Sequence, residues 1–327
     1  AVLINGTDGL VSTGTPGSGA LAPAGAGTRM VWSPNKSAFR AGSVLGTQWN
    51  DANIGVGSFA GGISTIASGQ NSFAMGSNNI ATGVGSTAMG TVNVASGAAA
   101  TAMGLANTAP SFGETVLGIG STTYVPSLNG NTQFRTANAT DRLLVVGNAI
   151  DANSNGIVEA AERSDALVIL KNGNAGHGVS APVARLQLET PANATQTQFT
   201  QSLLSAGLLI TTNFTAGSYT PGLFWNTTNN NATRPKAGIY LQETNTGSFM
   251  YLGTSNNYST GITNNAVVID PTGNVGIGTP APLDPLHVTG NIRMVDGNQA
   301  AGRVLVSDAN GTGTWTAPGA GTSGTLD

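Results

Sequence analysis

Residues 72–104 read SFAMGSNNIATGVGSTAMGTVNVASGAAATAMG, a stretch in which small residues recur at a fixed spacing. A small apolar residue returns every seven positions, and in most turns a glycine follows two residues later. The register extends in both directions, from Gly55 to Gly118, which is too long to arise by chance. The small apolar positions are Ala60, Ala67, Ala74, Ala81, Ala88, Ala95, Ala102, Ala109 and Val116.

The two halves of each repeat differ, so the full period is fourteen residues. Larger apolar side chains mark the difference, at Met75, Met89, Met103 and Leu117 after one set of alanines and at Ile66, Ile80 and Val94 before the other. A helix is excluded because a glycine every seven residues would cost about 1 kcal/mol each time relative to alanine. Two short strands per turn, each ended by a glycine that tolerates positive φ, fit the pattern.

Stacked turns of this kind predict two parallel sheets, with alanine side chains inside the coil and methionine side chains on the opposite face. Such a thin coil leaves the methionine row as an exposed apolar stripe, which usually marks an interface. A loose single-chain solenoid is the alternative, but stacked repeats generally need a continuous buried core. We therefore expect an all-β fold with a parallel β-roll or solenoid head whose methionine face is covered by other strands.

The alternation of Ser-x-Ala-Met-Gly with Ala-Ser-Gly at seven-residue spacing resembles the head repeats of trimeric autotransporter adhesins. The resemblance covers residues 55–118 and implies left-handed parallel β-rolls formed by three identical chains, assembled as an intertwined homotrimer. Residues 30–32, 36–42 and 48–51 resemble the segment that leads into such heads in bacterial and phage fibre proteins.

A second duplication relates residues 166–188 to residues 266–288 without a gap. Each copy predicts a strand, a glycine-rich turn and a second strand. The glycine runs are not dinucleotide-binding loops, because they open no helix of a βαβ unit. The second copy resembles a motif that marks narrow necks in tail-fibre and surface-fibre proteins. His177 stands where the other copy has Ile277. In a trimer, three copies of His177 near the axis would offer a metal or anion site, but simple packing of this side chain is the favoured interpretation. We expect His287 to be exposed.

Between the two necks, residues 190–265 predict a small β-sandwich knob with aromatic strands. Its aromatic side chains are interpreted as core rather than as a ligand platform, because aromatic residues dominate core energetics. They are Phe224, Trp225, Tyr240, Phe249 and Tyr251. The asparagine-rich loop at residues 226–233 is the first candidate for contact with a glycan or receptor, since binding residues favour exposed loops.

One motif carries metal chemistry, because residues 151–162 match the twelve-residue calcium loop at every ligand position. Calcium takes six to eight oxygen ligands, and this spacing wraps them around one point. A polar surface turn that leads into a short helix is the alternative. The expected ligands of a structural Ca²⁺ are Asp151, Asn153, Asn155, the carbonyl of Ile157, Glu159 and Glu162, with Gly156 at the sharp turn.

Composition excludes several classes of function. Charged residues are 8% of the 327, the net charge is −3, and no cysteine is present. Nucleic-acid binding needs a phosphate-neutralising surface that this balance does not supply, and no apolar run approaches the ~20 residues of a membrane helix. No catalytic constellation emerges, so we expect no enzyme; a glycan-active enzyme on a β-solenoid is a remote alternative, since fold does not decide function.

The predicted organisation has five parts: residues 1–54 as N-terminal strands and leading segment, 55–120 as the β-roll head, 121–189 with the calcium-type loop and first neck, 190–265 as the knob, and 266–327 as the second neck and stem. The expected function is a structural subunit of an extracellular fibre with an adhesive or receptor-binding role, whose partners are itself and a surface glycan or protein. The alternative is a self-polymerising filament joined by strand addition of the apolar residues 1–4.

Overall fold

The computed structural model describes residues 11–189, 217–226, 234–257 and 259–319, within two compact units at Ala1–Leu208 and Leu209–Asp327. Strands predominate, and the described residues contain no α-helix. The helical segments in this part of the chain are single 3₁₀ turns: η1 (Pro34–Lys36), η2 (Asp51–Asn53), η3 (Thr136–Asn138) and η4 (Ala160–Glu162). The expectation of an all-β fold is confirmed.

Two sheets build the first unit. An 11-stranded sheet has the order β1-β2-β3-β5-β7-β9-β11-β12-β13-β14-β15, and a 4-stranded sheet has the order β10-β8-β6-β4. The small sheet comprises β4 (Ile66–Ala67), β6 (Ile80–Ala81), β8 (Val94–Ala95) and β10 (Thr108–Ala109). The large sheet comprises β1 (Gly27–Ser33), β2 (Ala38–Val44), β3 (Phe59–Ile63), β5 (Phe73–Ser77), β7 (Thr87–Thr91), β9 (Thr101–Leu105), β11 (Thr115–Ile119), β12 (Arg142–Asn148), β13 (Asp165–Leu170), β14 (Ala175–His177) and β15 (Leu186–Leu188).

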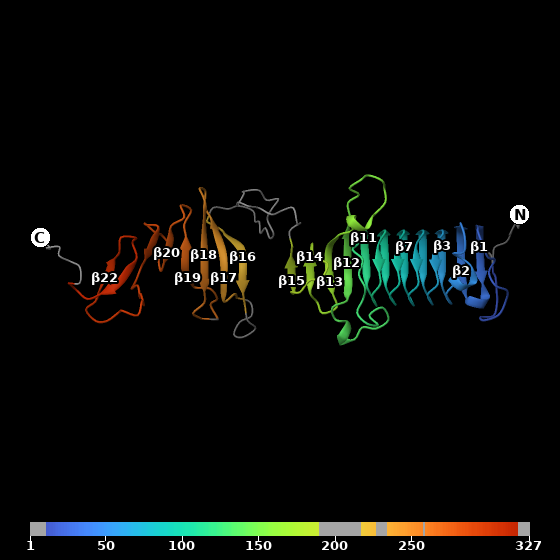
Figure 1. The fold of residues 1–327 in the computed structure, drawn as a ribbon, viewed down its shortest axis with the longest axis horizontal. Helices are drawn as coiled ribbons and strands as arrows, with labels where there is room; N and C mark the ends of the chain where they lie inside the picture. The colour runs from blue at the N-terminus through green and yellow to red at the C-terminus, as the bar shows by residue number, and fades with distance from the viewer. Residues whose placement is uncertain (1–10, 190–216, 227–233, 258, 320–327) are drawn as a thin grey trace. The chain divides into compact units, whose positions relative to one another are not determined.

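The repeat forms a solenoid, as its period predicts. From β3 to β11 the strands pair in parallel, and each turn carries one strand of the large sheet and one short strand of the small sheet up to β10. Figure 1 shows these strands side by side from β3 to β11. Ala74 pairs with Ala88, and Ala88 pairs with Ala102, so equivalent residues of successive turns lie directly above one another.

Alanine side chains fill the interior of the solenoid. In the large sheet the inward row runs from Ala60 to Val116, and in the small sheet it runs from Ala67 to Ala109; every member is fully buried. A methyl group is the largest side chain that most of these positions hold, and the two rows join in one hydrophobic core with Trp49. The predicted inward direction of the alanine side chains is therefore confirmed.

A second ladder, of asparagine side chains, lines the same interior. Asn79, Asn93 and Asn107 are fully buried at one corner of successive turns. The amide of Asn93 donates to the carbonyls of Met89 and Gly104, each at 2.7 Å, and its backbone N–H donates to the Oδ1 atom of Asn79 at 2.8 Å. Buried backbone groups need hydrogen-bond partners. The asparagine side chains supply them for the backbone groups at this corner, which the short strands leave unpaired.

The hairpin formed by β1 and β2 covers the first turn. The indole N–H of Trp49 donates to the carbonyl of Thr65 at 2.9 Å, and the buried guanidinium of Arg40 donates to the carbonyl of Ala67 at 3.0 Å. Burial lowers the pKa of Arg40 to about 10. These two side chains supply the hydrogen bonds that a preceding turn would otherwise make.

The second unit contains a 6-stranded sheet in sequence order and a separate two-stranded hairpin. The sheet comprises β16 (Tyr219–Trp225), β17 (Ala237–Glu243), β18 (Ser248–Thr254), β19 (Asn264–Ile269), β20 (Val275–Ile277) and β21 (Leu286–Val288), and the hairpin comprises β22 (Val304–Ser307) and β23 (Gly313–Thr316). The described strands of the predicted β-sandwich thus form one sheet, not two; residues 190–216 and 227–233 of that prediction lie outside the described residues. Alternation along a strand predicts an apolar face, but it does not identify what covers that face.

The duplicated motif folds in the same way in both units. In the first unit Val168 pairs with Gly176, and in the second Val268 pairs with Gly276, each across a glycine-containing turn. A third short strand then pairs in parallel with the second strand, as β15 does with β14 and β21 with β20. The predicted strand, turn and strand are confirmed.

Candidate functional site

The outer face of the solenoid carries the predicted apolar row, which we call the methionine ladder: Met75, Met89, Met103 and Leu117. Met75 pairs with Met89, and Met89 pairs with Met103, so the side chains stand in line. In the single chain Met75 is 47% exposed, Met103 36% and Leu117 37%. Exposed Ile63 and Ile119 widen the apolar surface at the ends of their strands. A contiguous apolar row of this kind is suited to cover by another protein surface.

The calcium-type loop projects beside the end of the solenoid and is curled by its own side chains. The carboxylate of Asp151 accepts the backbone N–H of Gly156 at 2.7 Å, and Oδ1 of Asn153 accepts that of Asn155 at 3.1 Å. Oδ1 of Asn155 in turn accepts the N–H of Ile157 at 2.8 Å. The turn is tight because Gly156 adopts φ 76°.

The two glutamates close the loop. The carboxylate of Glu162 accepts the N–H of Ala152 at 2.9 Å and that of Glu159 at 3.1 Å, which joins the two ends. Oε1 of Glu159 accepts the side-chain amide of Asn155 at 2.6 Å, while its Oε2 is enclosed without a hydrogen-bond partner.

All six predicted ligand residues lie within this loop. Across the part of the chain that the structure describes, however, no three His, Cys, Asp or Glu side chains lie together as a metal-binding group. The loop has only three carboxylates, so a calcium site here needs the amide oxygens of Asn153 and Asn155 and the carbonyl of Ile157 as well. The enclosed, unpartnered Oε2 of Glu159 fits such a site, because it is an oxygen without a protein donor.

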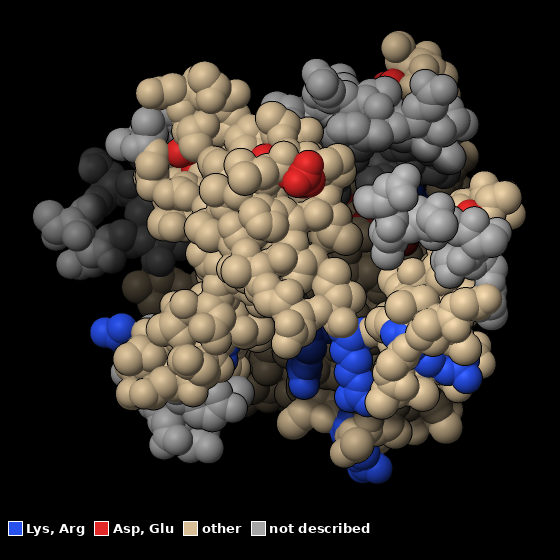
Figure 2. Space-filling view, turned by 90° about the vertical axis from the view of Figure 1, so that its left-hand side faces the viewer, with Lys and Arg blue, Asp and Glu red and all other residues tan. Residues whose placement is uncertain are grey.

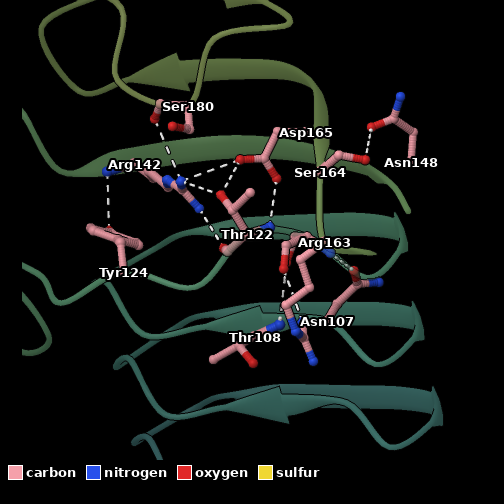
Figure 3. Close-up of polar contacts among 11 residues, drawn as sticks. Asn107, Thr108, Thr122, Tyr124, Arg142, Asn148, Arg163, Ser164, Asp165 and Ser180 are labelled. Carbon is pink, nitrogen blue, oxygen red and sulfur yellow. Dashed lines mark hydrogen bonds and ion pairs between the residues drawn. The ribbon is translucent and has the colours of Figure 1, made fainter. Parts of the chain in front are cut away.

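The loop is tied to the last solenoid turn by the residue that follows it. The guanidinium of Arg163 donates to the carbonyl of Ala106 at 2.7 Å and to that of Ser121 at 2.9 Å. Figure 3 shows Arg163 next to Asn107, where the asparagine ladder ends. Ordering of the loop would therefore be transmitted to the end of the solenoid.

A buried polar cluster closes this end of the solenoid, and sequence reasoning did not identify it. Arg142 lies 4.5 Å from the centre of the Tyr124 ring, forms an ion pair with Asp165 at 3.2 Å and donates to the carbonyl of Thr122 at 2.7 Å (Figure 3). The hydroxyl of Thr122 also hydrogen-bonds to Asp165. The cluster supplies partners for the strand edges where the regular repeat stops.

Glu114 is the fully buried acid of this region. Its Oε2 atom accepts the N–H of Ser111 at 2.9 Å, and its Oε1 atom has no partner. Burial raises the pKa of Glu114 to about 7, although the positive charges of Arg142 and Lys171 oppose the shift. The equivalent position in earlier turns holds a small residue, at Ser72, Ser86 and Ala100. The change to a glutamate at position 114 was the sequence signal that could have identified this buried acid.

The remaining candidate residues do not converge on a site. His177 is exposed on β14, as Ile277 is on β20. The prediction that the His177 side chain is packed is therefore wrong for the single chain. His287 is half-buried rather than exposed, and its Nδ1 atom accepts the N–H of Leu283 at 3.3 Å. Most of loop 226–233 and all of residues 1–4 lie outside the described residues.

Comparison with known proteins gives no assignment: no protein-family model and no curated protein matches this chain. Charged side chains are sparse on the surface that faces the viewer in Figure 2. No helix among the described residues is long and apolar enough to cross a membrane.

Proposed function

We propose that the chain is a non-catalytic structural subunit of an extracellular fibre with an adhesive or receptor-binding role, formed by three copies whose methionine ladders cover one another. The observation that carries the proposal is the exposed row from Met75 to Leu117 along the solenoid. An identical row on each copy allows three ladders to converge on the axis of a closed threefold ring, where each covers the other two. The likeness of the repeat to adhesin heads supports three copies and an extracellular location.

The variant Met103→Glu tests this assembly. Met103 is exposed in the single chain, so a carboxylate there should disturb few contacts within one solenoid. In an assembled fibre the same carboxylate would be buried without a partner, at a cost of several kcal/mol. We expect mass photometry to show trimers for the parent chain and loss of the trimer for the variant, whose separate chains should no longer unfold cooperatively.

The control for this test is Gln70→Glu, which adds the same charge at an exposed loop position of the same solenoid. It should leave the trimer intact. Trimers that persist in Met103→Glu at unchanged concentration dependence would contradict the proposed interface.

We also propose that residues 151–162 bind one Ca²⁺ ion that pins the loop on the fibre, with the weak affinity typical of extracellular modules. The ion would draw together the carboxylates of Asp151, Glu159 and Glu162, which do not form a group in the structure as described. Because Arg163 ties the loop to Ala106 and Ser121, binding should also stabilise the end of the solenoid.

Calorimetry with and without a chelator checks the calcium proposal. We expect millimolar-range Ca²⁺ to raise the melting temperature of the parent chain by a few degrees, and Glu162→Gln to abolish that rise. Asp284→Asn removes an exposed carboxylate outside the loop and should leave the rise unchanged. An identical melting temperature with and without chelator in the parent chain would disprove the site.

A further inference from the structure

A hollow of about 480 Å³ opens on the second unit between the aromatic face of β16 and β17 and the segment that precedes β19. This volume lies within the range of about 300–1,000 Å³ typical of small-ligand pockets. Its wall is aromatic on one side, and its rim is polar on the other. The residues that the argument uses are Tyr219, Phe224, Tyr240, Arg234, Thr260 and Asn265.

The aromatic wall is ordered by ring packing but remains open. Phe224 stacks on Tyr240 with centroids 5.7 Å apart and planes at 20°, and Tyr219 meets Tyr240 edge-on at 5.8 Å. The Phe224 ring can lie directly over residue 238 because this residue is a glycine; an added Cβ atom there would come within 2.4 Å of the ring. Tyr240 is buried, whereas Phe224 is 45% exposed and Tyr219 56% exposed. Two aromatic rings therefore face the hollow.

The polar rim carries one positive charge. The guanidinium of Arg234 donates to the carbonyl of Thr260 at 3.2 Å, which holds it at the mouth of the hollow. Tyr240 and Asn265 hydrogen-bond to each other across the base of the hollow. The lining contains no carboxylate, and Arg234 forms no ion pair with any residue that the structure describes. A planar guanidinium is suited to bidentate binding of a carboxylate.

We infer that this hollow binds the hexuronic acid ring of an acidic glycan. A pyranose ring presents an apolar C–H face, which fits the exposed rings of Phe224 and Tyr219, and hydroxyl groups, which fit the amide of Asn265 and the hydroxyl of Thr260. Its carboxylate pairs with Arg234. The inference deepens the proposed receptor-binding role by naming a site and a ligand class, and it rests on that role.

The binding test uses the full chain with two matched probes, oligogalacturonate and the same oligosaccharide with its carboxylates methyl-esterified. The ester keeps the sugar ring and removes the charge. We expect the acid to bind more tightly by about tenfold in titration calorimetry, because a hydrogen bond to a charged group is lost in the ester. The difference should shrink as salt is added.

Two variants separate the charge from the aromatic wall. Arg234→Gln should weaken the acid by about tenfold and leave the ester unchanged, whereas Phe224→Leu should weaken both. Arg293→Gln, an exposed arginine outside the hollow, is the charge-matched control and should alter neither.

Equal binding of acid and ester, full affinity of Arg234→Gln for the acid, or no binding of the acid by the parent chain would overturn the inference. The mass of each sample is measured alongside. If the chain is a trimer that does not bind oligogalacturonate, the glycan site is contradicted and the fibre proposal is unaffected. If the chain is a monomer, the fibre proposal itself is contradicted.

Discussion

The Gly90→Ala variant is expected to lose about 4 kcal/mol of folding free energy, from backbone strain and overpacking together. Gly90 adopts φ 107°, a conformation that L side chains rarely adopt. An added Cβ atom would also lie 2.2 Å from the carbonyl oxygen of Gly104 in the next turn. The two turns could accommodate the methyl group only by separating, which would break the parallel pairing of β7 with β9.

The control for this effect is Gly85→Ala in the same turn. Gly85 also adopts a left-handed conformation, φ 65°, but an added Cβ atom there would have no atom within 4 Å. Only the conformational cost of about 1–2 kcal/mol applies. Urea denaturation followed by circular dichroism measures both variants; equal losses would show that the turns are not stacked as closely as described.

The Glu114→Gln variant is expected to be more stable than the parent chain at about pH 8 and similar to it near pH 4. Burial raises the pKa of Glu114 to about 7 from an ordinary 4.5, so the folded state holds this proton more tightly than the unfolded state. The stability of the parent chain should therefore decline as pH rises from about 4.5 to about 7, and stay level above that. The shift corresponds to on the order of 3 kcal/mol.

Glutamine at position 114 keeps an oxygen to accept the N–H of Ser111 and carries no charge, so this pH dependence should disappear from the variant. Denaturation midpoints of both proteins across the pH range measure this pH dependence of stability. Parallel stability profiles for the two proteins between about pH 4.5 and pH 8 would show that Glu114 is not desolvated in the folded chain.

The solenoid could be predicted from the sequence because one physical constraint recurs in every turn. A narrow interior accepts only a methyl group, so alanine must return at Ala60, Ala74, Ala88 and Ala102, and the strand alternation then places methionine outside. The duplicated necks were equally predictable, since their glycines and apolar residues align without a gap.

Features that depend on partners distant in sequence could not be predicted. The asparagine ladder needs the corner geometry, in which Asn93 reaches Asn79 and Gly104. Glu114 becomes notable only when the structure shows that no solvent reaches it. The aromatic residues of the second unit were predicted to be core. This is right for Tyr240 and Tyr251, which are buried, and wrong for Phe224 and Trp225, which are exposed because the described strands form a single sheet.

The mass of the unsubstituted chain in dilute, native solution shows whether other copies cover the methionine ladder. An alanine-filled coil with an exposed methionine ladder is expected to be stable only with other copies over that ladder, so three times 32.6 kDa is the predicted mass. A well-folded particle of 32.6 kDa, with cooperative unfolding at the same concentration, would contradict the account.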